Sequence, residues 1–233
     1  SGTHSNFCVH DGSVYVRDED KCLRFDAATG KLLNQFKPPA DKDGKPTRWG
    51  YIACVNGILY GSVANTEHLV TYRYVNRGGD MSRQLTESNS LFAMNAKTGK
   101  LLWHYQAKDS IRHNAIAIDD EKVCLIDRPL ATFDREKKPA SKEHATGKLV
   151  AMDAKTGRVI WERKDDVYGT VLAFSKEHKA LMMSYQPTRF RLDSEVGGRI
   201  SVFDLYEGRP LWEVKADYQS RPMINDRTIY AQG

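Results

Sequence analysis

The chain has 233 residues, of which 35 are Lys or Arg and 30 are Asp or Glu, so its formal net charge is +5. With 40% apolar residues, 17 Gly and 4 Cys, the composition is ordinary for a globular protein and excludes collagen-like and disulfide-dense chains. No segment approaches the ~20 consecutive apolar residues of a membrane-spanning helix. The small charge excess does not indicate nucleic-acid binding.

One sequence pattern occurs four times. An apolar run ends in Asp or Asn, a glycine follows four residues later, and then come a basic residue and a second apolar run. The copies cover residues 22–36, 91–105, 149–163 and 200–214. Their glycines are Gly30, Gly99, Gly157 and Gly208, and Trp103, Trp161 and Trp212 share one position at which the first copy has Asn34. A Thr-Gly or Glu-Gly turn between two β-type runs predicts a β-hairpin.

A second hairpin precedes each copy, with turns such as Asp11-Gly12 and Asn56-Gly57. The repeating unit is therefore four antiparallel strands, which is typical of a β-propeller blade. We expect an all-β fold with very little helix. The blades should cover approximately residues 3–37, 48–107, 111–164 and 168–216, with half of a fifth at 219–233. The sequence thus predicts a single partial propeller of about four and a half blades, belonging to one of seven or eight.

Long insertions interrupt the last three complete blades, always between the second and third strands. They cover residues 65–89, 129–147 and 187–198. In an antiparallel meander these connections emerge on the same face as the links between blades, whereas the tight turns lie on the opposite face. Since binding residues concentrate on loops held by a rigid scaffold, the loop-rich face is the candidate working face.

The copy at 149–163, LVAMDAKTGRVIWER, resembles the repeat of the pyrroloquinoline-quinone (PQQ) dehydrogenase-like propellers, and the resemblance covers nearly the whole chain. It implies that Trp103, Trp161 and Trp212 dock against the neighbouring blades. It implies weaker attachment of the first outer strand, which has Asn34. The long insertions resemble those of bacterial extracytoplasmic proteins of the outer-membrane-biogenesis type, and imply a periplasmic or extracellular location.

This superfamily contains quinoprotein dehydrogenases, outer-membrane assembly scaffolds and sensor domains. In the enzymes, PQQ lies under a disulfide between adjacent cysteines, and carboxylate and Asn ligands hold Ca²⁺. Cys8, Cys22, Cys54 and Cys124 include no adjacent pair. The residues present therefore support neither PQQ nor Ca²⁺, although further blades could supply them. The cysteine spacing fits no zinc site, so we expect no metal, with Cys124 in a buried strand.

The starts of the inner strands should meet at the channel mouth on the loop-rich face. This ring is polar, aromatic and cationic, and could bind an anionic or sugar-like ligand through bidentate Arg donors and a stacking Trp. Propeller channels are also lined by polar side chains that need no ligand. The candidates are His4, Arg48, Trp49, Arg112, His113, Asn114, Tyr168 and Arg221.

The sequence shows no catalytic triad, nucleophile elbow or phosphate loop, so no catalytic residue is expected. Our main hypothesis is a non-catalytic extracytoplasmic binding or scaffold module. Its expected partners are the remaining blades of its own chain and a protein or small ligand on the loop-rich face. The alternatives are the propeller of a PQQ-dependent oxidoreductase and the sensor domain of a larger protein.

Overall fold

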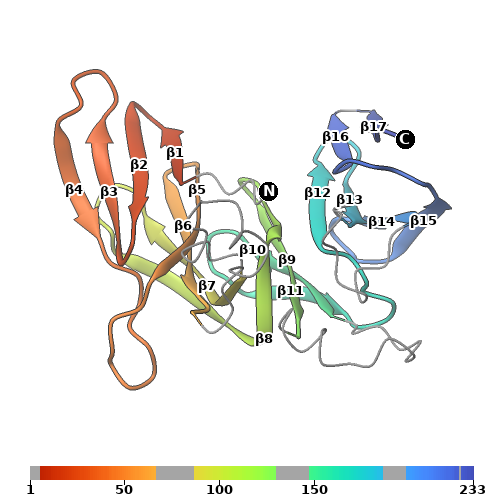
Figure 1. The fold of residues 1–233 in the computed structure, drawn as a ribbon, viewed down its shortest axis with the longest axis horizontal. Helices are drawn as coiled ribbons and strands as arrows, with labels where there is room; N and C mark the ends of the chain where they lie inside the picture. Colours follow the sequence, from red (N-terminus) through yellow and green to blue (C-terminus); the bar gives the residue numbers. More distant parts are fainter. Residues whose placement is uncertain (1–5, 67–86, 130–146, 186–197, 226) are drawn as a thin grey trace, which may run out of the picture. The chain divides into compact units, whose positions relative to one another are not determined.

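The computed structural model describes residues 6–66, 87–129, 147–185, 198–225 and 227–233. Every regular element in these ranges is a β-strand, and the strands pair antiparallel (Figure 1). The expectation of an all-β fold with very little helix is therefore confirmed. Within the described ranges, no helix has the length and apolar character needed to cross a membrane.

The chain divides into two compact units. The first contains residues 1–113, 119–121 and 154–157, and the second contains residues 114–118, 122–153 and 158–233. We describe each unit by itself and name the sequence copies as repeats 1 to 4.

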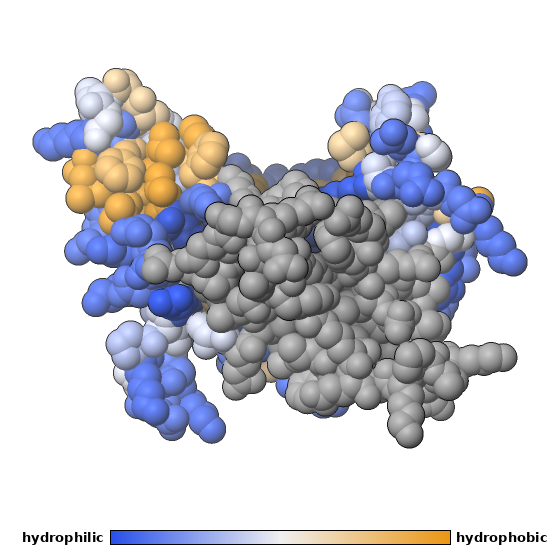
Figure 2. Space-filling model, in the orientation of Figure 1, coloured by the Kyte–Doolittle hydropathy of each residue, from blue (hydrophilic) through white to orange (hydrophobic). Residues whose placement is uncertain are grey.

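Repeat 1 is a four-stranded sheet in chain order. Its strands are β1 (Phe7–His10), β2 (Ser13–Asp18), β3 (Lys21–Asp26) and β4 (Leu32–Phe36). One face is apolar, because Val14 lies opposite both Val9 and Phe25, and Val16 lies opposite both Phe7 and Leu23. Phe7 and Val9 are 54% and 60% exposed, and Figure 2 shows hydrophobic residues gathered over this repeat at the upper left.

Repeats 2 and 3 share one seven-stranded sheet. Repeat 2 contains β5 (Trp49–Val55), β6 (Ile58–Ala64), β7 (Glu87–Asn95) and the first part of β8 (Leu101–Ile118). Repeat 3 contains the last part of β8, then β9 (Lys122–Arg128), β10 (Lys148–Asp153) and β11 (Val159–Arg163). β8 continues unbroken through the expected junction at 107–111, so one strand serves as the outer strand of repeat 2 and the inner strand of repeat 3.

Repeat 4 contains β12 (Val171–Ser175), β13 (Ala180–Ser184), β14 (Arg199–Asp204) and β15 (Pro210–Lys215), again in chain order. Two short strands follow, β16 (Met223–Asn225) and β17 (Thr228–Tyr230), which pair with each other. They correspond to the inner half of a further repeat. The strand order agrees with a partial propeller of four-stranded sheets.

The four equivalent turns share one local geometry. The side-chain oxygen of Asp26, Asn95 or Asp204 accepts hydrogen bonds from backbone N–H groups two and three residues later. The glycines then adopt φ between 69° and 71°. An L-residue with a Cβ is strained in this left-handed region, which explains glycine at the fourth position after the Asp or Asn.

Consecutive repeats are joined by hydrogen bonds to this turn. Tyr15 Oη donates to Ala96 O at 3.1 Å, and Tyr60 Oη donates to Ala154 O at 3.2 Å. Trp103 Nε1 donates to the same Ala154 O at 3.0 Å. In the second unit, Trp161 Nε1 donates to Leu205 O at 3.1 Å. The acceptor is always the residue that follows the Asp or Asn of the next repeat.

The turn glycine packs against an aromatic ring of the preceding repeat. A Cβ on Gly157 would lie 2.6 Å from Trp103 Cγ, and one on Gly208 would lie 2.6 Å from Trp161 Cδ2. Gly99 is covered in the same way by Phe36. The expectation that Asn34 weakens repeat 1 overlooked Phe36, which is buried two residues further along β4. Gly30 faces open space.

The three tryptophans differ in exposure. Trp103 is 8% exposed, Trp161 is half-buried, and Trp212 is 46% exposed. Docking between blades was expected for all three; Trp103 and Trp161 make the contacts described above, and for Trp212 docking stays a prediction. Within the described residues, β16 and β17 form two strands that follow repeat 4, and no Asp-x-x-x-Gly turn lies against Trp212.

Candidate functional site: the loop-bearing ends of the sheets

The two ends of the first insertion lie at the end of the sheet where β5 begins. Ala64 N donates to Arg48 O at 2.9 Å, and Asn65 N donates to Glu87 O at 2.8 Å. The two ends of the segment 66–86 are thus joined by the backbone. The Thr98-Gly99 turn lies at the other end of β7, because Asn95 closes that strand.

A buried ion pair supports this end of the first unit. Glu87 and Arg112 are cross-strand partners in β7 and β8, and Arg112 Nε lies 3.2 Å from Glu87 Oε1. Their side chains are 1% and 9% exposed. A buried charge is costly without a partner of opposite sign, so this pair holds both side chains in one arrangement.

Next to the ion pair runs a chain of buried hydroxyl and imidazole groups. Ser62 Oγ lies 2.7 Å from Ser88 Oγ, which lies 2.7 Å from His113 Nε2. Tyr51 N donates to Ser62 Oγ at 2.6 Å. A Cβ on Gly50 would lie 2.5 Å from Ser62 Oγ and 2.6 Å from Ser88 Oγ, so glycine is required there. These contacts connect the four strands β5, β6, β7 and β8 at the base of the first insertion.

Trp49 packs within the same unit and does not form an open stacking platform. It is 1% exposed, and its ring meets Phe92 edge-on with centroids 5.0 Å apart. Its Nε1 donates to Tyr51 O at 2.9 Å. At 1% exposure the indole offers no open face on which a ligand could stack.

The second insertion starts from a buried arginine. Arg128 is fully buried, and its Nη1 donates to Tyr168 O at 3.1 Å and to Gly169 O at 3.3 Å. At the other end of the segment 129–146, Gly147 N donates to Val167 O at 2.9 Å. Both ends of this insertion are therefore anchored to the segment that leads into β12.

Tyr168 is the centre of a polar network beneath the second and third insertions. Its hydroxyl lies 3.1 Å from Ser201 Oγ and donates to Met183 O or Arg199 O. The Arg199 guanidinium lies 3.8 Å from the centroid of its ring. Burial raises the pKa of Tyr168 to about 12, so the phenol stays protonated and acts as a donor.

Arg199 and Tyr218 close the base of the third insertion. Arg199 forms ion pairs with Asp166 at 2.6 Å and with Glu213 at 3.3 Å. The Tyr218 hydroxyl accepts from Tyr185 N at 3.1 Å and donates to Arg199 O at 3.0 Å. Since Tyr185 and Arg199 flank the segment 186–198, one phenol connects its two ends.

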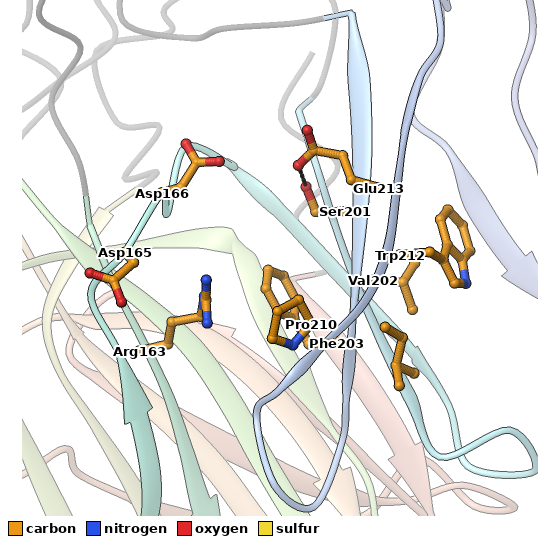
Figure 3. A pocket seen from close by; sticks show the side chains of 10 residues that line it. Arg163, Asp165, Asp166, Ser201, Val202, Phe203, Pro210, Trp212 and Glu213 are labelled. Carbon is orange, nitrogen blue, oxygen red and sulfur yellow. Dashed lines mark hydrogen bonds between the residues drawn. The ribbon is translucent and has the colours of Figure 1, made fainter.

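A small hollow of about 150 Å³ lies on the second unit (Figure 3). Its lining combines carboxylates, an arginine and apolar side chains. Arg163 lies over the ring of Phe203 at 5.4 Å, and Asp166 and Glu213 are held by Arg199. Because its volume is only about 150 Å³, the hollow has room for little more than one side chain. The lining residues are Arg163, Asp165, Asp166, Ser201, Val202, Phe203, Pro210, Leu211, Trp212 and Glu213.

The candidate channel-mouth residues have different environments. Arg112, His113, Trp49 and Tyr168 are buried within the contacts described above. Arg48 is exposed, Asn114 and Arg221 are half-buried, and His4 lies outside the described residues. The geometry favours a supporting role for the buried four over ligand binding. Sequence reasoning missed their partners Glu87, Ser62, Ser88, Arg128, Arg199 and Tyr218, because no local pattern reveals contacts between distant strands.

Three cysteines lie in or against one apolar cluster of the first unit. Cys22 is part of it, and Cys8 and Cys54 pack against it. Burial raises the pKa of Cys8 to about 12 and that of Cys54 to about 12. Cys124 is buried in β9. In the ranges that the structure describes, no group of three His, Cys, Asp or Glu residues is arranged to hold a metal ion.

The comparisons with known proteins agree with this architecture. The model of the family described as outer membrane protein assembly factor BamB matches residues 1–232. No curated protein matches the chain.

Solved structures with the same fold include BamB from Moraxella catarrhalis, with a TM-score of 0.58 and 13% identity over 100% of this chain and 56% of that chain. The quinohemoprotein alcohol dehydrogenase from Comamonas testosteroni has a TM-score of 0.54 and 17% identity over 91% of this chain and 35% of that one. Its counterpart ADHIIG from Pseudomonas putida HK5 has a TM-score of 0.53 and 15% identity over 89% and 33%. The chain thus spans about half or less of the length of these structures.

Proposed function

The chain belongs to the family of the outer membrane protein assembly factor BamB, and from this premise we propose that it is a non-catalytic, extracytoplasmic propeller module. Its function is to bind a protein partner through the three insertions at the loop-bearing ends of its sheets. The description of the family as an assembly factor supports a scaffold role, and one of the similar solved structures is itself a BamB.

One observation carries this proposal: each of the three insertions begins and ends on a base that buried polar groups hold in place. The first base contains Glu87 and Arg112, the second contains Arg128, and the third contains Tyr218. A loop held on a rigid base loses less conformational freedom when it binds than a loop on a mobile one, so such bases suit recognition.

The residues present do not fit the cofactor of the dehydrogenases with the same fold. No two cysteines are adjacent in the sequence, and the described carboxylates form no metal-binding group. Carboxylates beside the insertions, such as Glu87, Asp166 and Glu213, are engaged by Arg112 or Arg199. The proposal therefore contains no redox step.

The structure suggests a direct test of the loops. Because Asn65 N and Glu87 O are already hydrogen-bonded, the segment 66–86 can be replaced by an Asn-Gly turn. We expect the melting temperature to change by no more than about 2 °C, as for other surface changes. A protein that copurifies with the unmodified chain from its natural host should be lost. A matched control carries Lys100→Asn, which changes one exposed side chain in the turn at the opposite end of the same sheet.

Retention of every partner by the loop variant, or equal loss in the control, would contradict the proposal. A second arm titrates the unmodified chain with PQQ and Ca²⁺ and follows the quinone absorbance. Stoichiometric binding of PQQ, with dye reduction in the presence of a primary alcohol, would favour the oxidoreductase alternative.

A further inference from the structure

Two of the chain's four cysteines lie on neighbouring inner strands of the first unit. Cys8 lies on β1, opposite Tyr15, and Cys54 lies on β5, opposite Leu59. Side chains of directly opposite residues in an antiparallel pair share one face. Tyr15 and Leu59 are buried in one apolar cluster to which repeats 1 and 2 both contribute, and both cysteines pack against it. Since β1 and β5 are in contact, the two thiols enter the same space between the two repeats.

Two hydrogen-bonded contacts show how β1 and β5 are aligned. The Arg17 guanidinium donates to Asn6 Oδ1 and to Gly50 O, both at 2.6 Å, so it connects the beginnings of the two strands. At their other ends, His10 Nε2 accepts a hydrogen bond from Gly57 N at 2.9 Å. β1 and β5 therefore run in the same direction, with Asn6 near Gly50 and His10 beside Gly57.

The two cysteines lie at matching heights between these contacts. Cys8 is two residues from the contact on either side of it, and Cys54 lies four residues after Gly50 and three before Gly57. Cys8 and Cys54 are therefore neighbours across the space between their strands. The electrostatic effect of the two groups agrees with this placement, because the charge of Cys54 adds to burial in raising the pKa of Cys8.

The other two cysteines do not compete for Cys8. Cys22 lies on β3, which is separated from β1 by β2. Two strand spacings amount to about 9.5 Å, whereas a disulfide joins Cα atoms no more than about 7 Å apart. Cys124 belongs to the second unit. Cys22 and Cys124 are both 0% exposed, whereas Cys8 and Cys54 are partly exposed and can meet a reagent.

We propose that Cys8 and Cys54 form a reversible disulfide that links β1 of repeat 1 to β5 of repeat 2. All four cysteines are thiols in the structure, which is therefore the reduced form. The oxidant is a disulfide of another molecule. The thiolate of one cysteine attacks one sulfur of that disulfide, the S–S bond breaks and a first thiolate leaves. The second cysteine attacks the mixed disulfide, the Cys8–Cys54 bond forms and a second thiolate leaves.

This exchange balances without a further reactant. The two cysteines lose two electrons and two protons, and the oxidant takes up both and becomes two thiols. A disulfide persists in an extracytoplasmic compartment, and this step rests on the location in the proposed function. The bond closes the chain between residues 8 and 54, which restrains the unfolded state and stabilises the folded one.

The reaction should be slow at neutral pH. Burial raises the pKa of Cys8 and of Cys54 to about 12, and only the thiolate attacks a disulfide. Far below the pKa, the thiolate fraction falls tenfold for each pH unit. The link should therefore form about tenfold more slowly at pH 7.5 than at pH 8.5.

The experiment uses the reduced 233-residue protein and glutathione disulfide. After incubation at either pH, acid stops the exchange, the remaining thiols are alkylated, and the protein is digested with trypsin and analysed by mass spectrometry. Cleavage after Lys and Arg places each cysteine on its own peptide, with residues 1–17, 22–24, 49–73 and 123–128. We expect peptides 1–17 and 49–73 to be joined, and to separate on reduction. The oxidised protein should melt at least about 4 °C higher than the reduced one.

Two variants complete the test. Cys54→Ser should lose both the joined peptides and the rise in melting temperature, whereas Cys22→Ala should keep both. If either variant folds poorly, the peptides of the unmodified protein still decide the outcome. Absence of the joined pair after prolonged oxidation, a bond from Cys8 to Cys22, or a bond only between two copies of the chain would overturn the proposal.

A last measurement separates this proposal from the proposed function. Protein isolated from its natural host, with thiols alkylated during lysis, should already contain the joined peptides. If the bond forms with glutathione disulfide but is absent from the host protein, the pairing of Cys8 with Cys54 is supported, and the extracytoplasmic location is contradicted.

Discussion

Gly157 lies so close to the indole of Trp103 that a Cβ on the glycine would stand 2.6 Å from Trp103 Cγ. The same indole donates to Ala154 O, three residues before that glycine. One tryptophan thus contacts both ends of a single turn. This explains why the Asp-x-x-x-Gly spacing and the tryptophan recur together along the chain.

The first prediction concerns the cost of losing such an indole. Trp103→Ala removes a buried ring and a hydrogen bond, so it should destabilise the protein by ~3–5 kcal/mol. Leu102→Ala is the control, because Leu102 is 44% exposed on the same strand, and surface changes usually stay within ~0.5 kcal/mol. Urea unfolding of both variants measures the difference. Equal losses would show that the Trp103 contacts do not stabilise the protein.

The second prediction compares two glycines with the same backbone. Gly157 has φ 69° and Gly30 has φ 71°, so alanine at either position should cost ~1–2 kcal/mol for the left-handed conformation. Only Gly157 also meets a ring, whereas Gly30 faces open space. Gly157→Ala should therefore cost a further ~1–3 kcal/mol. Thermal unfolding measures both variants, and a larger loss for Gly30→Ala would refute the stacking argument.

The third prediction concerns repeat 1, where Phe36 replaces the tryptophan. Phe36 is 5% exposed and covers Gly99, whereas Asn34 is exposed. Phe36→Ala should cost ~3–5 kcal/mol, and Asn34→Ala should change stability by ~0.5 kcal/mol or less. Chemical denaturation distinguishes the two. If Asn34→Ala proved the more harmful, the attachment of β4 would depend on the tryptophan position after all.

The fourth prediction is a pH dependence. Hydrogen bonds from Glu207 N and Tyr206 N lower the pKa of Asp204 below its ordinary value of 3.8. The folded state therefore gains stability at pH values above 3.8, and this gain is lost as the pH falls through the lowered pKa. Asn95 makes the same turn with a neutral amide oxygen. Asp204→Asn should thus flatten the acid side of the stability profile.

The converse change is the control for that profile. Asn95→Asp places a carboxyl group in an equivalent turn and should make the acid side steeper. Unfolding free energies measured between about pH 2 and pH 5 cover the range of both changes. Identical profiles for Asp204→Asn and the unmodified protein would mean that the turn carboxylate contributes nothing to acid stability.

The fifth prediction concerns the buried pair of Glu87 and Arg112. Glu87→Gln leaves Arg112 buried without its carboxylate and should cost ~3–5 kcal/mol. The double variant Glu87→Gln with Arg112→Met removes both charges and should recover part of that loss. A double-mutant cycle on unfolding free energies gives the coupling. Additive losses would show that the two side chains do not support each other.

The repeated frame alone predicted the all-β fold, the four-stranded repeats and the family, because turn chemistry is local. Asp26 and Gly30 shape their turn through contacts within five residues, and every copy shows the same spacing. The position of the insertions, between the second and third strands of each repeat, also follows from the positions of the two hairpins predicted from their turns.

Only the tertiary structure decided what the polar residues at the loop-bearing ends do. Arg112 and His113 were predicted to bind a ligand, but their partners Glu87 and Ser88 lie on β7. Arg128 donates to backbone carbonyls 40 and 41 residues away in the sequence. Phe36 covers a turn glycine where the other repeats use a tryptophan, and Trp212 is exposed. Both facts depend on which strand lies next to each side chain. The sequence by itself determines local geometry, whereas burial and pairing depend on distant strands that no local pattern specifies.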